Sequence, residues 1–420
     1  MNRLQVVAVV VSVVAGCGGS GPTATQTAPI SSPVEAATPT PAVASPTTSA
    51  DSTAAVASPT ASAGSTPEPT PSITPDTTVP GGAAPPYGVA ANGLVAYSDE
   101  GDIYARHIDT GAVTLLVGGP EIDVGPAFSR DGSLLAFIRV VGEQPEVVAV
   151  MIASSDGSRV HAAVEPEPAG RTHWSEWSPE SAPHRLVIVN NAAGVPPLSI
   201  VKVGGSPERR TIELPLEVGA TDWRPGTDEL VFRGREPEAR PNAWGFYAVG
   251  TEGSGLRELV APLGFEGTHH APFSLSHDGR FLAYTSSERQ GSLGVNILDL
   301  ESGDTRPLGG SGLQGWATFS PDGERLAFIR YSDPAGSDIA AQTFVSPSDG
   351  DGTDAVAIGP EIRIQQNTAG LRIQFSPDGT TVLIVHAAGE EAWLADVATG
   401  DHESVAVGDD EWVTWQRRAP

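Results

Sequence analysis

Short apolar runs alternate with polar turns through most of the chain. The most regular unit is an aromatic residue, then Ser-Pro-Asp-Gly, then an apolar run, as at 319–329 and 375–385. Asp-Gly between two apolar runs predicts a β-hairpin, because Gly tolerates the positive φ of a tight turn. A second pair of strand-like runs follows in each unit, as at 294–300 and from Thr305 onward. We therefore expect four short strands per unit, named A to D in chain order.

The units recur at a nearly regular spacing. In each unit one aromatic or apolar residue directly precedes the turn, and we call this residue the anchor. The anchors lie 49, 46, 52, 44 and 56 residues apart, at Phe128, Trp177, Trp223, Leu275, Phe319 and Phe375. A period of about 40–50 residues built from four strands is typical of a β-propeller blade.

The two ends of the repeated region complete one more blade. Residues 93–117 hold strands B to D without an A strand, whereas 411–416 hold an A strand with nothing after it. Pairing these segments ties down both ends, which otherwise fray. Together with the six internal units, the sequence predicts an all-β, seven-bladed β-propeller of four-stranded blades, closed by pairing of its first and last segments.

The repeats resemble those of the TolB family and its WD-repeat-like relatives, whose hairpins carry a similar aromatic-Ser-Pro-Asp-Gly-Lys sequence. The resemblance covers residues 88–417 and implies a TolB-like propeller. It leaves the function open, because propellers host binding and catalysis alike. TolB proteins place a separate folded domain ahead of the propeller, and in this chain only a linker is expected at that place.

Residues 1–16 have the pattern of an export signal. Arg3 precedes an apolar run that ends in small residues before Cys17. The run is shorter than the ~20 residues that span a bilayer. Small residues directly before a Cys resemble the bacterial lipoprotein signal, which implies cleavage before Cys17 and lipid attachment to it; an ordinary signal peptide is the alternative. Cys17 is the only Cys, so disulfides and thiol catalysis are excluded.

Pro, Ser, Thr and Ala dominate the stretch from Cys17 to residue 86. Such a segment buries too little apolar surface to offset its chain entropy, so we expect a disordered linker. The predicted organisation is a lipoprotein signal peptide at 1–16, a lipidated Cys and linker at 17–86, and the propeller at 87–420. This places the protein outside the cytoplasm, lipid-anchored to the bacterial cell membrane on its periplasmic or cell-surface side.

The net charge limits the possible partners. It is −27 for the whole chain, of which residues 1–86 contribute −3 and the propeller −24. A strongly acidic domain repels phosphate backbones and anionic lipid headgroups. We therefore expect no nucleic-acid partner, and membrane contact through the lipid only.

The candidate ligand-binding residues come from the inner strands. In a propeller the A strands line the central channel, so residues at one distance from their anchors share a level. Three positions before the anchors lie Trp174, Trp316 and Arg372, and Trp412 lies three positions before Trp415 in the last A strand. His270 lies five positions before the anchor Leu275. These side chains could stack a sugar or an aromatic group and hydrogen-bond its edges. The alternative is that the Trp rings wedge between blades as core.

Other chemistry finds little support. His269 and His270 are adjacent, and adjacent strand residues point to opposite faces, so with His173 they do not predict a metal site. Residues 349–354 resemble a calcium loop but lack the Glu at the twelfth position, and we expect a turn between strands C and D. The chain contains no Gly-x-Ser-x-Gly nucleophile motif. No metal, cofactor or catalytic residue is predicted.

Two functions remain. The first is a non-catalytic binding or scaffold module for an envelope protein partner, presented on a long tether. The alternative is an extracytoplasmic lyase or hydrolase that acts on carbohydrate or cell wall at the channel mouth. A saccharide or another small ligand is compatible with both.

Overall fold

The structure is a computed structural model, and its described part begins at Ala84. The described ranges are 84–142, 147–168, 173–180, 183–192, 194–204, 208–240, 243–264, 273–289, 292–310, 312–332, 338–365, 371–386, 391–408 and 412–419. Regular structure in these ranges is β-strand, and they contain no helix long and apolar enough to cross a membrane.

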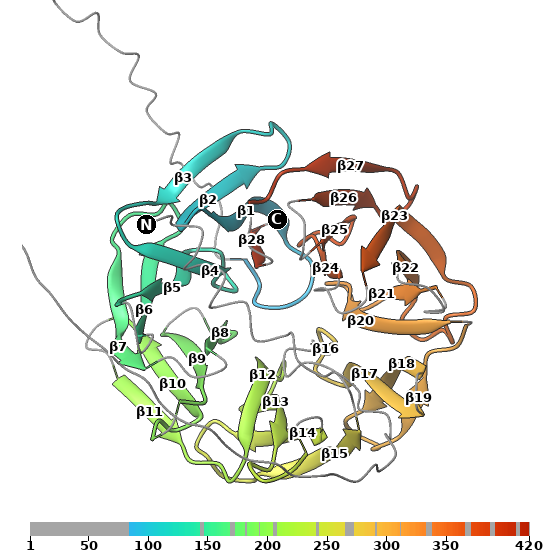
Figure 1. The fold of residues 1–420 in the computed structure, drawn as a ribbon, viewed down its shortest axis with the longest axis horizontal. Coiled ribbons are helices and arrows are strands. Elements are labelled where there is room, and N and C mark those ends of the chain that lie inside the picture. Colours follow the sequence, from blue (N-terminus) through green and yellow to red (C-terminus); the bar gives the residue numbers. More distant parts are fainter. Residues whose placement is uncertain are drawn as a thin grey trace, which may run out of the picture. The chain divides into compact units, whose positions relative to one another are not determined.

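The described strands form seven antiparallel sheets of four strands each. The sheets stand as blades in a ring, with strand A of each blade innermost and strand D outermost (Figure 1). The predicted seven-bladed β-propeller is thus confirmed as the fold.

The blades are numbered along the ring, and the strands of each blade run from A to D. Blade 1 holds β28 (Val413–Arg418), β1 (Ala91–Asp99), β2 (Asp102–His107) and β3 (Val113–Val117). Blade 2 holds β4 (Ile122–Phe128), β5 (Leu134–Val140), β6 (Val147–Ser154) and β7 (His161–Pro168). Blade 3 holds β8 (His173–Trp177), β9 (His184–Asn190), β10 (Leu198–Val203) and β11 (Glu208–Ile212). Blade 4 holds β12 (Glu217–Trp223), β13 (Glu229–Arg235), β14 (Ala243–Gly250) and β15 (Arg257–Gly264). Blade 5 holds β16 (Phe273–Leu275), β17 (Phe281–Arg289), β18 (Ser292–Asp299) and β19 (Thr305–Pro307). Blade 6 holds β20 (Leu313–Phe319), β21 (Arg325–Tyr331), β22 (Asp338–Pro347) and β23 (Val356–Gln365). Blade 7 holds β24 (Leu371–Phe375), β25 (Thr381–His386), β26 (Ala392–Asp396) and β27 (His402–Val405).

The last strand closes the ring against the first. β28 pairs antiparallel with β1, with Trp415 opposite Val95 and Val413 opposite Tyr97. In Figure 1 the red β28 lies beside the blue β1 in one blade. The predicted closure is confirmed. The predicted C–D turn at 349–354 is confirmed as well, because it joins β22 to β23.

All six predicted anchors are the final residue of an inner strand. Their side chains reach between blades. The Trp177 indole Nε1 donates to the Ala127 carbonyl of blade 2 at 2.9 Å, and Trp223 Nε1 donates to the Glu176 carbonyl of blade 3 at 3.3 Å. A buried indole N–H needs such a partner, so these bonds fix the anchor rings at the blade interfaces.

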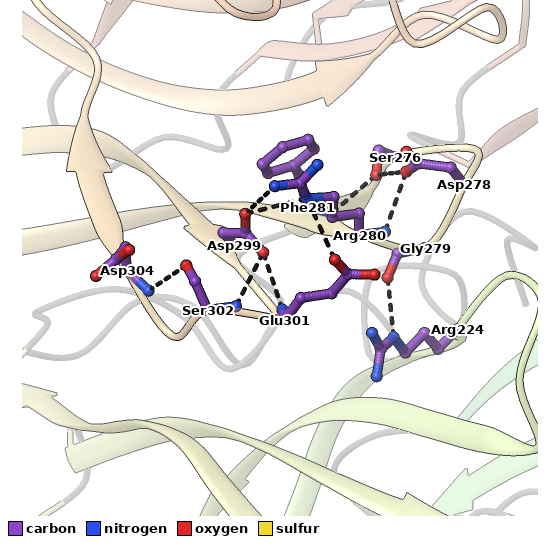
Figure 2. Close-up of polar contacts among 10 residues, drawn as sticks. All are labelled: Arg224, Ser276, Asp278, Gly279, Arg280, Phe281, Asp299, Glu301, Ser302 and Asp304. Carbon is purple, nitrogen blue, oxygen red and sulfur yellow. Dashed lines mark hydrogen bonds and ion pairs between the residues drawn. The ribbon is translucent and has the colours of Figure 1, made fainter.

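The turn after the anchor is organised by a buried serine. Figure 2 shows blade 5, where the Ser276 hydroxyl donates to Asp278 Oδ1 at 2.5 Å and accepts from the Phe281 N–H at 2.9 Å. Asp278 Oδ1 also accepts from the Arg280 N–H at 3.0 Å. The hydroxyl thus makes both a donor and an acceptor bond, and an unmade bond in a buried place costs about 1–3 kcal/mol.

The same bonds recur in three other blades. In each, the serine donates to the aspartate two residues later and accepts from the N–H five residues later; the pairs are Ser129 with Asp131, Ser320 with Asp322, and Ser376 with Asp378. Although burial opposes the shift, these hydrogen bonds hold the pKa of all four aspartates below its usual range.

The core is divided among the blade interfaces. The described residues form seven hydrophobic clusters, and each cluster joins two neighbouring blades. Alternate residues of one strand serve two interfaces: Leu326 and Phe328 of β21 face blade 5, whereas Ala327 and Ile329 face blade 7. This explains why strand B is an unbroken apolar run, since both of its faces are buried.

Two glycines with similar positive φ angles allow the cost of backbone strain to be distinguished from the cost of steric overlap. Gly279 has φ +71°, and an added Cβ would lie 2.3 Å from the Pro225 carbonyl of the preceding blade. Gly303 has φ +79° and open space around it. We expect Gly303→Ala to lower the free energy of unfolding by about 1 kcal/mol from strain alone, and Gly279→Ala by about 3 kcal/mol because overlap adds to it. Urea unfolding measures both; equal losses would contradict the close contact between blades.

The hairpin aspartates predict acid sensitivity. Their folded pKa values are depressed, so the unfolded chain binds protons more readily, and the stability they provide at neutral pH is lost as pH falls below the unfolded value of about 3.9. Asp378→Asn should cost about 1 kcal/mol at pH 7. The difference from the parent should shrink at pH 3, as measured by urea midpoints at fixed ionic strength. Asp304→Asn, in an exposed turn, is the control. A pH-independent difference would argue against the depressed pKa.

Candidate functional site

Three of the predicted site residues come together on neighbouring blades. The Arg372 guanidinium carbon lies 4.1 Å from the ring centroid of Trp412 and 5.3 Å from that of Trp316. Arg372 is on β24, Trp316 on β20, and Trp412 directly precedes β28, so the group spans the inner strands of blades 6, 7 and 1. All three side chains are half-buried. Cation–π contacts of this length contribute about 0.5–2 kcal/mol each, depending on exposure.

The backbone of Trp316 is unusual for its residue type. It has φ +56°, in the left-handed region that non-glycine residues rarely adopt. The residue sits in a β-bulge of β20, between Gly315 and Thr318. Its N–H donates to the Thr285 Oγ1 of blade 5 at 3.2 Å, which holds the bulge in place. Bulges of this kind re-aim a side chain and recur beside active and binding sites.

Two polar side chains of blades 6 and 7, those of Gln314 and His386, have buried atoms without a hydrogen-bond partner in the described structure, and sequence reasoning singled out neither. Gln314, also on β20, is buried, and its Oε1 makes no hydrogen bond with any residue that the structure describes. The same holds for both ring nitrogens of His386, which pairs across the sheet with Leu371, the neighbour of Arg372. The only sequence signal for His386 is that it ends the apolar run of β25. Gln314 Oε1 is a hydrogen-bond acceptor, whereas a neutral His386 ring has one donor and one acceptor nitrogen.

The other predicted site residues are not brought into this cluster by the described structure. Trp174 is in β8, but its side chain lies outside the described residues, as does that of His173. His269 and His270 lie outside them entirely. Within the described ranges, no group of His, Cys, Asp and Glu is arranged to hold a metal ion.

In blade 2, the residue five positions before the anchor is Asp123, and it forms a structural ion pair. Asp123 is buried and accepts two hydrogen bonds from Arg139, at 2.7 and 2.8 Å. Burial raises the pKa of Asp123, and Arg139 works against that shift. The two-point geometry satisfies both carboxylate oxygens, so this pair stabilises the strand pair β4–β5 rather than offering a free acid.

The chain itself occupies the hairpin end of the channel. Residues 84–90, which we call the strap, precede β1 and lie inside the ring of inner strands (Figure 1). The Tyr87 hydroxyl donates to the Trp223 carbonyl of blade 4 at 3.3 Å. The Ala90 N–H donates to the Pro377 carbonyl of blade 7 at 2.9 Å.

Two arginines hold the strap by charge and hydrogen bonding. Arg417 Nη2 donates to the carbonyls of Pro85 (2.9 Å) and Gly88 (2.7 Å). Burial, together with the positive charge of Arg130, lowers the pKa of Arg417 to about 10. Arg130 lies 5.3 Å from the Tyr87 ring centroid and donates to Asp222 Oδ1 at 2.7 Å. Burial raises the pKa of Tyr87, so its phenol stays protonated as a hydrogen-bond donor.

The two ends of the channel therefore differ. At the hairpin end, the backbone of the strap contacts blades 1 and 7, and the Tyr87 side chain contacts blades 2 and 4. The cluster of Trp316, Arg372 and Trp412 lies farther back along the inner strands, toward the loops that join strand D of one blade to strand A of the next. A ligand that reaches this cluster would approach from the D–A end.

The fold and this cluster define a β-propeller with an aromatic–guanidinium group on its inner strands. The sequence matches no protein-family description, and no curated protein matches it. Similar solved structures include an oligogalacturonate lyase in complex with manganese (15% identity, 71% of this chain and 83% of that chain, TM-score 0.51).

A prolyl endopeptidase is also similar (13% identity, 76% of this chain and 50% of that chain, TM-score 0.52). A third is a putative TolB from Agrobacterium tumefaciens (18% identity, 69% of this chain and 95% of that chain, TM-score 0.40). At these identities, the lyase and the endopeptidase show a shared fold and nothing finer.

The strap contacts can be tested at Tyr87. Tyr87→Ala removes a half-buried ring and a hydrogen bond, so we expect a loss of about 2 kcal/mol in unfolding free energy and faster hydrogen exchange at the Ala90 amide. Val89→Ala changes a side chain of the same segment that is exposed, and should stay within about 0.5 kcal/mol of the parent. Unchanged exchange at Ala90 in Tyr87→Ala would contradict the role of Tyr87 in holding the strap.

Proposed function

We propose that this chain is a membrane-anchored, extracytoplasmic β-propeller that acts as a non-catalytic binding module for an envelope protein. Trp316, Arg372 and Trp412 carry the binding. The lipid on Cys17 anchors the chain, and residues 18–83 tether the propeller. Membrane contact is through the lipid only, since the acidic domain repels anionic headgroups.

The observation that carries this proposal is the guanidinium of Arg372 held between two half-buried Trp rings. Arg and Trp are enriched among the residues that dominate the energy of protein interfaces. A guanidinium offers a fork of N–H donors, and an indole offers one N–H donor and no acceptor. The arrangement is suited to recognition of a planar or carboxylate-bearing side chain rather than to acid–base chemistry.

A second candidate is a lyase or hydrolase that acts on carbohydrate or cell wall. The observation in its favour is the same cluster, since Trp rings stack on sugars and a guanidinium pairs with a sugar carboxylate. A similar fold belongs to an oligogalacturonate lyase. This candidate needs a proton acceptor beside the cluster, and His386 is the titratable group nearest to Arg372 in strand register.

Crosslinking on intact cells tests the proposal. The tagged lipoprotein would be captured with photo- or carboxylate-reactive crosslinkers, because Lys202 is the only lysine. We expect a stoichiometric envelope protein with the parent chain, reduced about tenfold or more in Arg372→Ala by loss of the central cation. Arg280→Ala is the matched control: it removes the same charge from an exposed arginine that bonds Asp299 on the outer part of blade 5 (Figure 2).

Two outcomes would count against the binding module. Recovery of the propeller alone from parent cells would favour the carbohydrate candidate, and a saccharide binding screen with and without manganese would follow. Equal loss of the partner in Arg372→Ala and Arg280→Ala would show that net charge, not the cluster, governs capture. Thermal unfolding of both variants confirms that each remains folded.

A further inference from the structure

The outermost strand of blade 1 lacks the protection that the other six blades have. A strand at the edge of a sheet exposes unpaired backbone groups, and proteins blunt such edges with charged residues or proline. The six protected outer strands each contain at least one charged residue: β7, β11, β15, β19, β23 and β27. β3 reads Val-Thr-Leu-Leu-Val, with neither a charge nor a proline.

The side chains of β3 are also exposed. Val113 is 46% exposed and Leu115 52%, and as alternate residues of one strand they share a face. On the same side, Tyr104 and Ile108 of blade 1 and Val405 of blade 7 are half-buried against the cluster between these two blades. Together with Val113 and Leu115, these residues form an apolar rim patch where blade 1 meets blade 7.

The neighbouring blade is too short to cover the patch. β27, the outer strand of blade 7, spans only His402–Val405. Along its free side β3 pairs with no described strand, since β2 is its sole partner in the sheet. A bulge at Leu116 limits the regular edge to Val113–Leu115 and the residues before it. The edge can therefore accept a short segment.

We propose that β3 is a docking edge for an extended segment of a partner protein in which apolar residues alternate with Lys or Arg. Strand addition joins the backbones and leaves alternate side chains to contact the rim patch. Basic residues are favoured by two exposed carboxylates, Asp109 in the turn before β3 and Glu403 on β27. Arg106, which pairs across the sheet with Val113, has its guanidinium engaged by the carbonyls of Gly111 and Ala406. The propeller as a whole carries −24.

The same charge disfavours a second copy of this chain as the occupant. Edge-to-edge pairing of two β3 strands would bring together two domains of −24, each with its own Asp109 near the seam. The docking edge is independent of the proposed function, because it lies on the outer strand and shares no residue with the cluster on the inner strands.

The probe is a synthetic peptide with the sequence KVKVKVK, titrated into the full-length protein in detergent. EVEVEVE tests the charge requirement, and KKVVVKK tests the alternation. The test variant is Leu115→Lys, which gives β3 the charge that the other outer strands have. The matched control is Val356→Lys, because Val356 is 63% exposed at the start of the already protected β23 and the charge change is the same.

We expect saturable binding of KVKVKVK that weakens about tenfold in Leu115→Lys and changes less than about twofold in Val356→Lys. The peptide should slow hydrogen exchange at residues 113–115. The proposal is overturned by equal weakening in both variants, by equal binding of KKVVVKK, or by no saturable binding up to about 1 mM. It is also overturned by a dimer in sedimentation that Leu115→Lys disperses, since a second copy would then be the occupant.

Discussion

The hydrogen bonds of the buried serine in the A–B turn constrain the rest of this propeller. Ser376 is fully buried, so its hydroxyl must be satisfied within the turn, and the bonds to Asp378 and to the Thr381 N–H fix the angle between strands A and B. The anchor Phe375 then ends strand A at the blade interface. In blade 5 the same turn brings Gly279 against Pro225 of blade 4. One local interaction therefore sets the hairpin and also the contact between neighbouring blades.

Closure of the ring gives the molecule two unlike ends. β28 and β1 share blade 1, so the first and last described strands stabilise each other rather than fraying. Arg417, near the end of β28, also binds the strap ahead of β1 through Pro85 and Gly88. Closure and occupation of the hairpin end are thus carried out by the same short stretch of chain. The hairpin end of the described inner strands is therefore filled by the chain itself.

The sequence predicts what depends on local turn chemistry and register. The anchors were predictable because four of the six are followed by an Asp-Gly turn and the other two, Trp177 and Trp223, keep the same spacing. Trp316, Arg372 and Trp412 could be grouped because inner strands share a register. The positive φ of Trp316 was not predictable, since that conformation is normally signalled by Gly, as at Gly125 on the same level of blade 2. The strap was missed for a different reason: Arg417 binds its backbone carbonyls, which no side-chain pattern reveals.

Two kinds of tryptophan occur on these inner strands, and their differences bear on function. Trp177 and Trp223 are 2% and 1% exposed, and their indole N–H groups donate to the preceding blade, as core residues should. Trp316 and Trp412 are half-buried and both contact the Arg372 guanidinium, and Trp316 also packs against the apolar cluster between blades 6 and 7. Packing alone favours the first arrangement, and the left-handed backbone of Trp316 adds strain of about 1 kcal/mol. Core formation therefore accounts for the anchor rings and for one side of Trp316, but it does not require the guanidinium between Trp316 and Trp412 or the partial exposure of both rings.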